Sequence, residues 1–205
     1  MAINPESASR PLPRILDALP TDARILDAGG WFKPLAEATH VVDIMPYQTR
    51  RGRVQPDPLP AERFTAATWH LTNFLAPHLH LPFPDRFFAF AYCGQTVEDL
   101  VDPVPLLREL NRVSQSGLIE SPSRLLEQTI GVRDRIGPGI GHPHHHWILD
   151  GAEGHLDFSP KRALGDLSPR QYGVPLLTYN RLVAGDGGRC ACRVEWNDHL
   201  TWTLV

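Results

Sequence analysis

The chain has 205 residues, of which 42% are hydrophobic and 21% are charged, values typical of one globular domain with a full hydrophobic core. Its formal net charge of −3 gives no electrostatic footprint for nucleic acid or for a membrane surface, so neither is expected as a partner. No apolar run approaches the roughly 20 residues that cross a bilayer, and no signal peptide is evident, so we expect one cytoplasmic domain over residues 1–205.

The first part of the chain alternates helical and strand patterns. Apolar residues at a helical spacing predict a helix over 11–20. The apolar run at 23–30 ends in Asp27 and two glycines, a pattern typical of a buried strand entering a tight turn. A short helix or helical turn over 34–40 and a second buried strand over 40–45 are expected next. This order of elements is the opening of a doubly wound α/β sheet.

The remainder of the chain continues the sheet and then closes it. The next predicted elements are strands over 68–74 and 86–95, an amphipathic helix over 102–114 and a fifth strand over 116–123. A hairpin is expected over 146–160, and two closing strands over 189–205. The expected fold class is therefore α/β: a Rossmann-like doubly wound sheet, mostly parallel, with an antiparallel C-terminal edge.

Glycines and polar residues stand where such a sheet binds ligands, at the carboxyl ends of its strands. Gly29 and Gly30 allow the backbone to approach a ligand closely, where a Cβ would obstruct it. Asp43 ends the second strand and can accept hydrogen bonds from both hydroxyls of a ribose. Asn73, after the third strand, can read the edge of an adenine. The pattern predicts a ligand that contains adenosine.

Two collinear sequence blocks carry a family resemblance. They read "ILDAGG…ATHVVDIMPY" and "LPFPDRFFAFAYCGQTVEDLVDPVPLLRELNRVSQSGLIESPSR", and together they cover roughly residues 23–124. The blocks resemble class I S-adenosylmethionine-dependent methyltransferases, in particular the methyltransferase type 11-like group. The resemblance implies a Rossmann-like fold, S-adenosylmethionine as cofactor and methyl transfer to a small-molecule acceptor.

The resemblance also implies a cofactor-binding set that follows the first four strands. The methionine part of the cofactor would lie along the first members, the ribose and adenine along the middle ones, and the sulfonium and substrate beside the last. In chain order the set is Asp27, Gly29, Gly30, Asp43, Ile44, Asn73, Phe74, Cys93 and Gln95.

The first turn departs from the family pattern, because Trp31 and Phe32 stand where the family has further glycine. Their bulk would crowd a pyrophosphate. S-adenosylmethionine carries no phosphate, so the departure disfavours NAD more than it disfavours S-adenosylmethionine.

The run "GHPHHHW" at 141–147 is a second candidate site. Along an extended segment His142, His144 and His146 would share one face, with His145 opposite. Three such imidazoles can hold Zn²⁺ or Fe²⁺, or they can line an acceptor pocket as general bases. Carboxylates at the ends of neighbouring strands, among them Glu98 and Asp99, could complete the site or steer a base.

These patterns leave several readings open. The catalytic candidates are His146, His144 and Glu98, and the metal candidates are His142, His144 and His146. The leading hypothesis is methyl transfer. The alternatives are a methyltransferase-fold protein with changed, metal-dependent chemistry at the histidine run, and a binding protein without catalysis. The acceptor and the oligomeric state are not specified by the sequence.

Two smaller clusters have plain interpretations. Cys190 and Cys192 are expected to be small buried or half-buried side chains rather than metal ligands. Arg50, Arg51 and Arg53 are expected to form a solvated loop, with a lid over an acidic substrate as the alternative.

Overall fold

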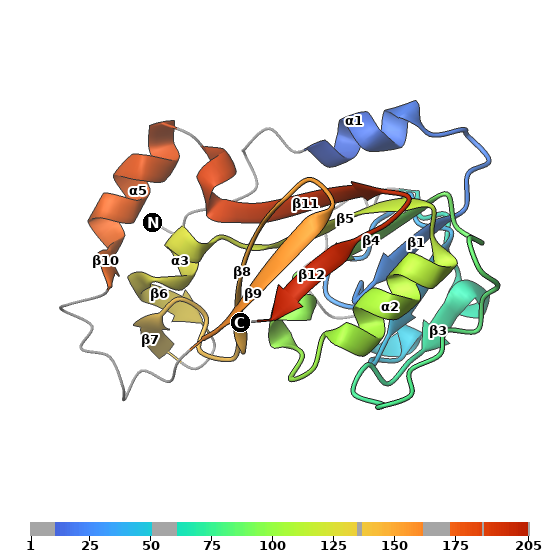
Figure 1. Ribbon diagram of the computed structural model, residues 1–205, viewed down its shortest axis with the longest axis horizontal. Coiled ribbons are helices and arrows are strands. Elements are labelled where there is room, and N and C mark those ends of the chain that lie inside the picture. Colours follow the sequence, from blue (N-terminus) through green and yellow to red (C-terminus); the bar gives the residue numbers. More distant parts are fainter. Residues whose placement is uncertain (1–10, 51–60, 135–136, 162–172, 186, 205) are drawn as a thin grey trace.

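A six-stranded sheet forms the centre of the computed structural model, which describes residues 11–50, 61–134, 137–161, 173–185 and 187–204. The strand order is β11-β5-β4-β1-β2-β3 (Figure 1). The first five strands of the chain run parallel, and β11 pairs antiparallel with β5. This arrangement confirms the expected fold class and its antiparallel edge. The strands are β1 (Ile25–Ala28), β2 (His40–Asp43), β3 (Trp69–Leu71), β4 (Phe90–Gly94), β5 (Ser116–Pro122) and β11 (Ala191–Asn197).

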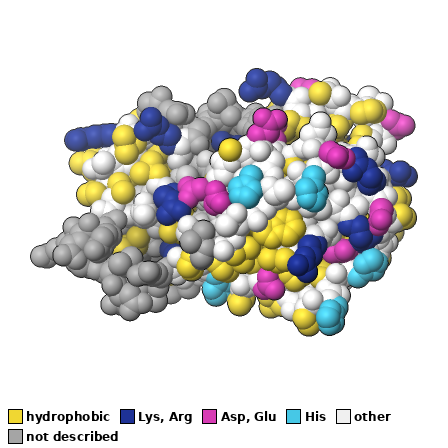
Figure 2. Space-filling view, in the orientation of Figure 1, with side chains coloured by type: hydrophobic (Ala, Val, Ile, Leu, Met, Phe, Trp, Pro, Cys, Tyr) yellow, Lys and Arg dark blue, Asp and Glu magenta, His cyan; other side chains and the backbone are white. Residues whose placement is uncertain are grey.

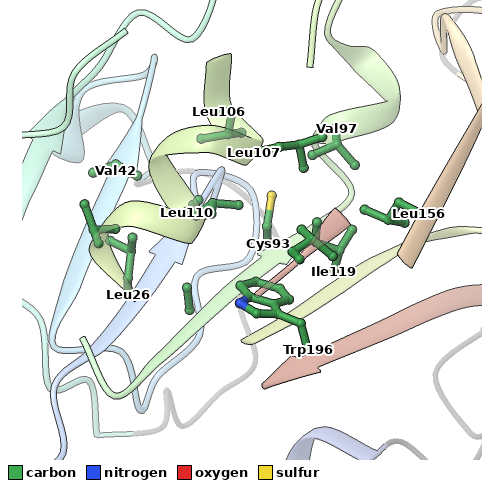
Figure 3. Packing of buried hydrophobic residues seen from close by; sticks show 14 of the residues in the cluster. Leu26, Val42, Cys93, Val97, Leu106, Leu107, Leu110, Ile119, Leu156 and Trp196 are labelled. Carbon is green, nitrogen blue, oxygen red and sulfur yellow. The ribbon is translucent and has the colours of Figure 1, made fainter. Parts of the chain in front are cut away.

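Helices cover both faces of this sheet. Successive residues of a strand point to opposite faces, so each strand contributes apolar side chains to both. On one face Leu26 of β1 lies in a core cluster with the apolar side of α2 (Val104–Val113). On the other face Ile25 lies in a second cluster, against which α1 (Pro11–Ala18) packs. Figure 3 shows the first cluster, in which three α2 leucines lie over side chains from β1, β2, β4, β5 and β11. Its labelled members include Leu26, Val42, Cys93, Leu106, Leu107, Leu110, Ile119 and Trp196.

Of the two alternatives predicted for residues 34–40, between β1 and β2, the structure has the turn and not the short helix. The segment contains one hydrogen-bonded turn, in which the Ala38 amide donates to the Leu35 carbonyl at 3.0 Å. The Leu35 amide donates to the carboxylate of Asp27 at 2.7 Å. A helix is not continued because Thr39 already donates to Ile25 in the sheet. On this face the N-terminal α1 supplies the helical cover.

The second half of the chain adds two three-stranded sheets. One has the order β10-β6-β7 and the other β12-β9-β8. The hairpin expected over 146–160 is confirmed as antiparallel β8 and β9. The two closing strands are also present, but they do not pair with each other: β11 joins the central sheet, and β12 runs parallel to β9. The elements are α3 (Arg124–Glu127), β6 (Thr129–Asp134), β7 (Gly137–Ile140), β8 (Trp147–Ala152), β9 (His155–Pro160), β10 (Val174–Pro175), α5 (Leu176–Gly185) and β12 (Thr201–Leu204).

Short 3₁₀ helices lie in the connections, and one of them corrects the interpretation of the arginine cluster. They are η2 (Tyr47–Arg50), η3 (Ala66–Thr68), η4 (Val97–Asp99) and η6 (Gly187–Cys190). Arg50 is buried rather than solvated, because its guanidinium makes a bidentate ion pair with Glu62 at 2.6 and 2.8 Å. Arg51 and Arg53 lie outside the described residues.

An ion-pair clamp joins α2 to the loop before β4. Arg112 donates two hydrogen bonds to Glu109, at 2.8 and 2.6 Å, and it also donates to the carbonyls of Leu81 and Phe83. Glu109 accepts the amide of Leu81 at 2.6 Å. The "LPFPD" segment, beginning at the fully buried Leu81, is thereby held on the helix.

On the face drawn in Figure 2, Lys and Arg side chains lie interspersed with Asp and Glu side chains. Within the part of the chain that the structure describes, no helix is long and apolar enough to cross a membrane. The three cysteines carry free thiols: Cys93 and Cys190 are buried, and Cys192 is half-buried.

Candidate functional site

A cavity of about 350 Å³ lies at the carboxyl ends of the central strands. Its walls include the turn after β1 and the end of β4, the two neighbouring strands at which the strand order reverses. Ligands of open α/β sheets bind at such a switch point, and the volume falls within the range of small-molecule sites. The lining residues are Asp27, Gly29, Gly30, Phe32, Lys33, Tyr92, Gly94, Gln95, Glu120, Pro122, Leu126, His142, Cys190, Ala191 and Arg193.

The glycine turn lines the cavity and also packs closely against side chains of the protein itself. Gly29 has a φ of +85°, and a Cβ there would lie 1.9 Å from the hydroxyl oxygen of Thr96, which follows β4. A Cβ on Gly30 would lie 2.4 Å from a carboxylate oxygen of Asp27. Both glycines are therefore required by close packing, and both also present backbone to the cavity.

Asp27 ends β1 almost completely buried, with 1% of its surface exposed. Burial raises the pKa of its carboxyl to about 7. The hydrogen bond from the Leu35 amide opposes this shift, and the nearby Asp43 adds to it. A carboxyl with this pKa is partly protonated at neutral pH, so it can both donate and accept a proton at the cavity wall.

Asp43 stands at the end of β2, next to the cavity but not in its wall. Its two oxygens accept the backbone amides of Trp31, at 2.9 Å, and of Met45, at 2.7 Å. Burial raises the pKa of the Asp43 carboxyl, and these amide hydrogen bonds oppose the shift. The next residue, Ile44, is 49% exposed and offers an apolar surface beside the carboxylate.

Two members of the predicted cofactor set lie in the core instead of facing a ligand. Cys93 has no exposed surface, because the alternation along β4 turns it towards α2, while Tyr92 and Gly94 line the cavity. Phe74 is also in this core cluster, with 4% exposed. Both expectations are therefore corrected. Asn73 is exposed, and its side-chain oxygen accepts the amide of Leu75 at 3.0 Å.

The antiparallel edge strand brings residues to the cavity that the sequence did not point to. Arg193 of β11 lies directly opposite Glu120 of β5, and its Nε donates to the carboxylate of Glu120 at 2.6 Å. Both residues line the cavity, as do Cys190 and Ala191. Glu120 lies near the end of β5, whose apolar pattern is visible in the sequence. Arg193 could be found only from the register of β11 on β5, which no sequence pattern gives.

The histidine run forms a turn rather than the expected extended segment. The amide of His145 donates to the carbonyl of His142 at 3.2 Å, and Pro143 with its fixed φ lies inside this turn. As a result the rings of His142, His144 and His145 gather, with centroids 4.4–5.8 Å apart. His145 is therefore not opposite the others. The side chain of His146 is exposed, and its amide donates to the carbonyl of Glu98.

Only one histidine of the run, His142, lines the cavity. Its pKa is lowered, first by burial and then by the neighbouring His145, so the imidazole is neutral near pH 7. His145 is buried, and its Nδ1 lies 2.8 Å from a carboxylate oxygen of Glu127. The catalytic candidates His144 and His146 are absent from the cavity wall.

Glu98, the third catalytic candidate, is buried with 1% exposed. Neither of its carboxyl oxygens has a hydrogen-bond partner among the described residues. Burial raises the pKa of this carboxyl well above its usual value, and the nearby Asp99 and Glu127 contribute to the shift. Burial therefore disfavours the charged form of Glu98, and its side chain does not line the cavity.

Solved structures similar to this chain include an S-adenosylmethionine-dependent methyltransferase from Mesorhizobium loti, with 18% identity over 64% of each chain and a TM-score of 0.41. A second is a Haloferax volcanii chain solved in complex with the Trm112 methyltransferase activator, with 15% identity over 55% of this chain and 51% of that one and a TM-score of 0.37. A third is the [4+2]-cyclase SpnF, with 17% identity over 68% of this chain and 57% of that one and a TM-score of 0.40. In the first two, the chain spans about half to just under two thirds of the neighbour's length.

No protein-family model matches the chain, and no curated protein sequence matches it. At these identities and TM-scores the likeness carries no argument about function. The fold class rests on the order and direction of the strands.

Proposed function

We propose that the protein binds S-adenosylmethionine at the switch-point cavity and transfers its methyl group to a small-molecule acceptor. The position of the cavity carries this proposal: it lies at the carboxyl ends of β1 and β4, over a glycine turn, beside an acidic residue that ends β2. An adenosine-bearing ligand requires these three features of a parallel sheet.

The chemistry of the cavity wall fits the amino-acid end of S-adenosylmethionine, which carries an ammonium and a carboxylate. Asp27 and Glu120 supply acidic groups to the wall, and Lys33 and Arg193 supply basic ones. Gly29 and Gly30 line the same cavity. The wall therefore offers partners of both signs to a zwitterion.

The end of β2 fits the adenosine part. The two carboxylate oxygens of Asp43 offer about four lone-pair sites, of which the Trp31, Met45 and Ile44 amides occupy three at most, so a ribose hydroxyl can still donate a hydrogen bond to this group. The exposed side chain of Ile44 provides an apolar platform for a base. This assignment places the ribose between Asp43 and the glycine turn.

On the acceptor side, the cavity residue suited to proton transfer is His142. Bound in the cavity, S-adenosylmethionine supplies an electrophilic methyl group to a nucleophile aligned with it. His142 is neutral near pH 7 and lines the same cavity, so it can take the proton that the acceptor releases. Gln95 and Tyr92 line the cavity from the end of β4 and would orient the acceptor.

The test is a calorimetric titration of the full chain with S-adenosylmethionine and with S-adenosylhomocysteine. Asp43→Asn keeps one oxygen as an acceptor for one of the Trp31 and Met45 amides, replaces the other oxygen with an NH₂ group, and removes the charge that binds the ribose. Because a hydrogen bond to a charged group contributes about 1.5–3 kcal/mol, we expect this variant to bind about 10- to 100-fold more weakly. The exposed Asp22 provides the control, and Asp22→Asn should bind like the wild type.

Two results would overturn the proposal. One is the absence of binding of either compound at millimolar concentration. The other is an Asp43→Asn variant that binds as tightly as the wild type, which would place the ligand elsewhere.

A further inference from the structure

A cluster of metal-ligating side chains lies beside the cavity, on the far side of His142. It consists of Asp99 at the end of η4 and of His144 and His145 in the histidine turn, and one ligand atom from each lies within 4.8 Å of the others. We propose that Asp99, His144 and His145 bind a divalent transition-metal ion. The site is separate from the proposed methyl transfer and does not depend on it.

The distances between the ligand atoms fit a shared ion better than hydrogen bonds. Asp99 Oδ1 lies 3.5 Å from His145 Nε2 and 3.7 Å from His144 Nε2. An N–H···O hydrogen bond is usually about 2.7–3.2 Å long. Two donors on a tetrahedral ion with bonds of about 2.1 Å lie roughly 3.4 Å apart. The distances from Asp99 Oδ1 to the two histidine nitrogens are therefore close to those between ligand atoms on a bound tetrahedral ion.

A buried carboxylate orients one of the two imidazoles. Nδ1 of His145 lies 2.8 Å from Oε1 of Glu127, and Glu127 is itself 2% exposed and held by Lys161. With its proton on Nδ1, His145 donates to Glu127 and turns the Nε2 lone pair towards Asp99. Histidine ligands of metals commonly have such a carboxylate partner behind them.

The electrostatic surroundings favour a cation at this point. Asp99 carries the negative charge that an ion here would neutralise. Glu127 is already paired with Lys161, and burial disfavours the charged form of Glu98.

The donor set of two imidazoles and one carboxylate suits Zn²⁺ or Fe²⁺. Three protein ligands leave coordination positions open. The ring of His142 lies 4.8 Å from that of His145, so the ion would be separated from the cavity by one imidazole.

The experiment uses the full chain without a polyhistidine tag, freed of metal by a chelator and titrated with Zn²⁺ by calorimetry. We expect one ion per chain, and an intense visible absorption when Co²⁺, which reports four-coordinate geometry, is used in its place. Asp99→Ala and His144→Ala change side chains that are 41% and 46% exposed, so both variants should fold. Each should lower the affinity for Zn²⁺ at least 100-fold.

Two further variants separate this site from adventitious binding. Glu127→Gln keeps the hydrogen bond to His145 but removes its charge, and it should lower the affinity for Zn²⁺ about 10- to 100-fold. His155→Ala is the matched control. His155 also lies near a carboxylate, that of Asp157 at 3.3 Å, but belongs to no described three-ligand cluster, so the variant should bind like the wild type.

The proposal is overturned if the wild type binds less than one ion per chain, or if His155→Ala weakens binding as much as His144→Ala. It is also overturned if Asp99→Ala and His144→Ala bind like the wild type. Titration with S-adenosylmethionine in the absence of metal reports on the proposed function alone, so the failure of either proposal can be recognised without the other.

Discussion

At the scale of single residues, burial decides what the carboxyl groups around the cavity can do. Asp27 and Glu98 are both almost fully enclosed, and the pKa of each is raised because a charged carboxylate loses its hydration there. Asp27 retains a hydrogen bond from the Leu35 amide, whereas Glu98 has none among the described residues. Asp27 is therefore the acid that titrates near neutral pH.

The Asp27 carboxyl makes the stability of the protein depend on pH. The folded state keeps this proton up to about pH 7, whereas the unfolded chain loses it near the usual aspartate pKa of 3.8. The folded state thus binds more protons between these values, and the free energy of unfolding falls as the pH rises from about 4 to 7. Asp27→Asn has no such proton, so its free energy of unfolding should fall less over this window. The expected difference is on the order of 4 kcal/mol, about three pKa units at 1.36 kcal/mol each.

Denaturant unfolding of both proteins at a series of pH values measures this difference directly. The exposed Asp22→Asn serves as the control and should keep the wild-type slope. Equal slopes for Asp27→Asn and the wild type would show that Asp27 is already ionised in the folded protein.

Single residues of the site were predictable where their position depends only on the strand that precedes them. Asp27, Gly29, Gly30 and Gln95 reach the cavity because each follows or ends a strand whose pattern is clear in the sequence. The sequence did not distinguish these cavity-lining residues from Cys93 and Phe74, which lie in the core. A shift of one position along an extended segment decides whether a side chain faces the ligand or the core. The sequence does not locate the ends of strands to within one residue.

At the scale of elements, the best-matching sequence block proves to be a structural clamp. Within "LPFPD…RELNRV", the acidic and basic residues Glu109 and Arg112 tie α2 to the loop at Leu81. The pairing is partly buried, with Arg112 23% and Glu109 9% exposed. This block therefore fixes α2 against the loop that precedes β4.

Removing the cation of this clamp leaves a buried carboxylate without its partner. Arg112→Met should lower the free energy of unfolding by about 3 kcal/mol, the cost typical of breaking a buried ion pair. Arg108 lies on the same helix with an exposed side chain, and Arg108→Met should change stability by less than about 0.5 kcal/mol. Urea denaturation compares the two variants. Similar losses in both would mean that helix propensity, not the clamp, is responsible.

Element type was predictable where apolar periodicity is strong and less so where single backbone hydrogen bonds decide. The helix over 102–114 and the hairpin over 146–160 follow from their spacing. Of the short helix or helical turn expected over 34–40, the turn forms, and the Thr39 amide then donates to Ile25 in the sheet. The histidine run turns at Pro143 because the carbonyl of His142 accepts the amide of His145, a bond that periodicity does not report.

At the scale of the whole molecule, the parallel order of five strands was predictable and the assembly of the C-terminal half was not. Parallel strands joined by short crossovers follow one another in a few allowed ways. The strands β11 and β12 are close in sequence but enter different sheets, and that choice depends on which edges the rest of the fold leaves open. For this reason the sequence did not predict the part of the cavity wall that β11 forms.

Ligand binding at the switch point should stabilise the entire fold, because the cavity wall combines β1, β4, β5 and β11. A ligand at 100 times its dissociation constant contributes about 2.7 kcal/mol. For a chain of this size each kcal/mol raises Tm by about 2–4 °C, so S-adenosylmethionine should raise Tm by roughly 5–10 °C. ATP shares the adenosine but carries phosphates that the side chain of Phe32 in the cavity wall would crowd, so it should leave Tm unchanged. An equal shift with ATP would contradict a phosphate-free site.

The contact between Gly30 and Asp27 has a consequence for the evolution of this turn. A side chain at position 30 would strike the carboxylate of Asp27, so neither residue can be exchanged for a larger one independently of the other. Among relatives of this chain, the two positions should vary together, with alanine at 30 accompanied by a smaller residue at 27. A glycine in such a turn can thus be retained by natural selection for its intramolecular neighbour, whether or not a nucleotide is ever bound.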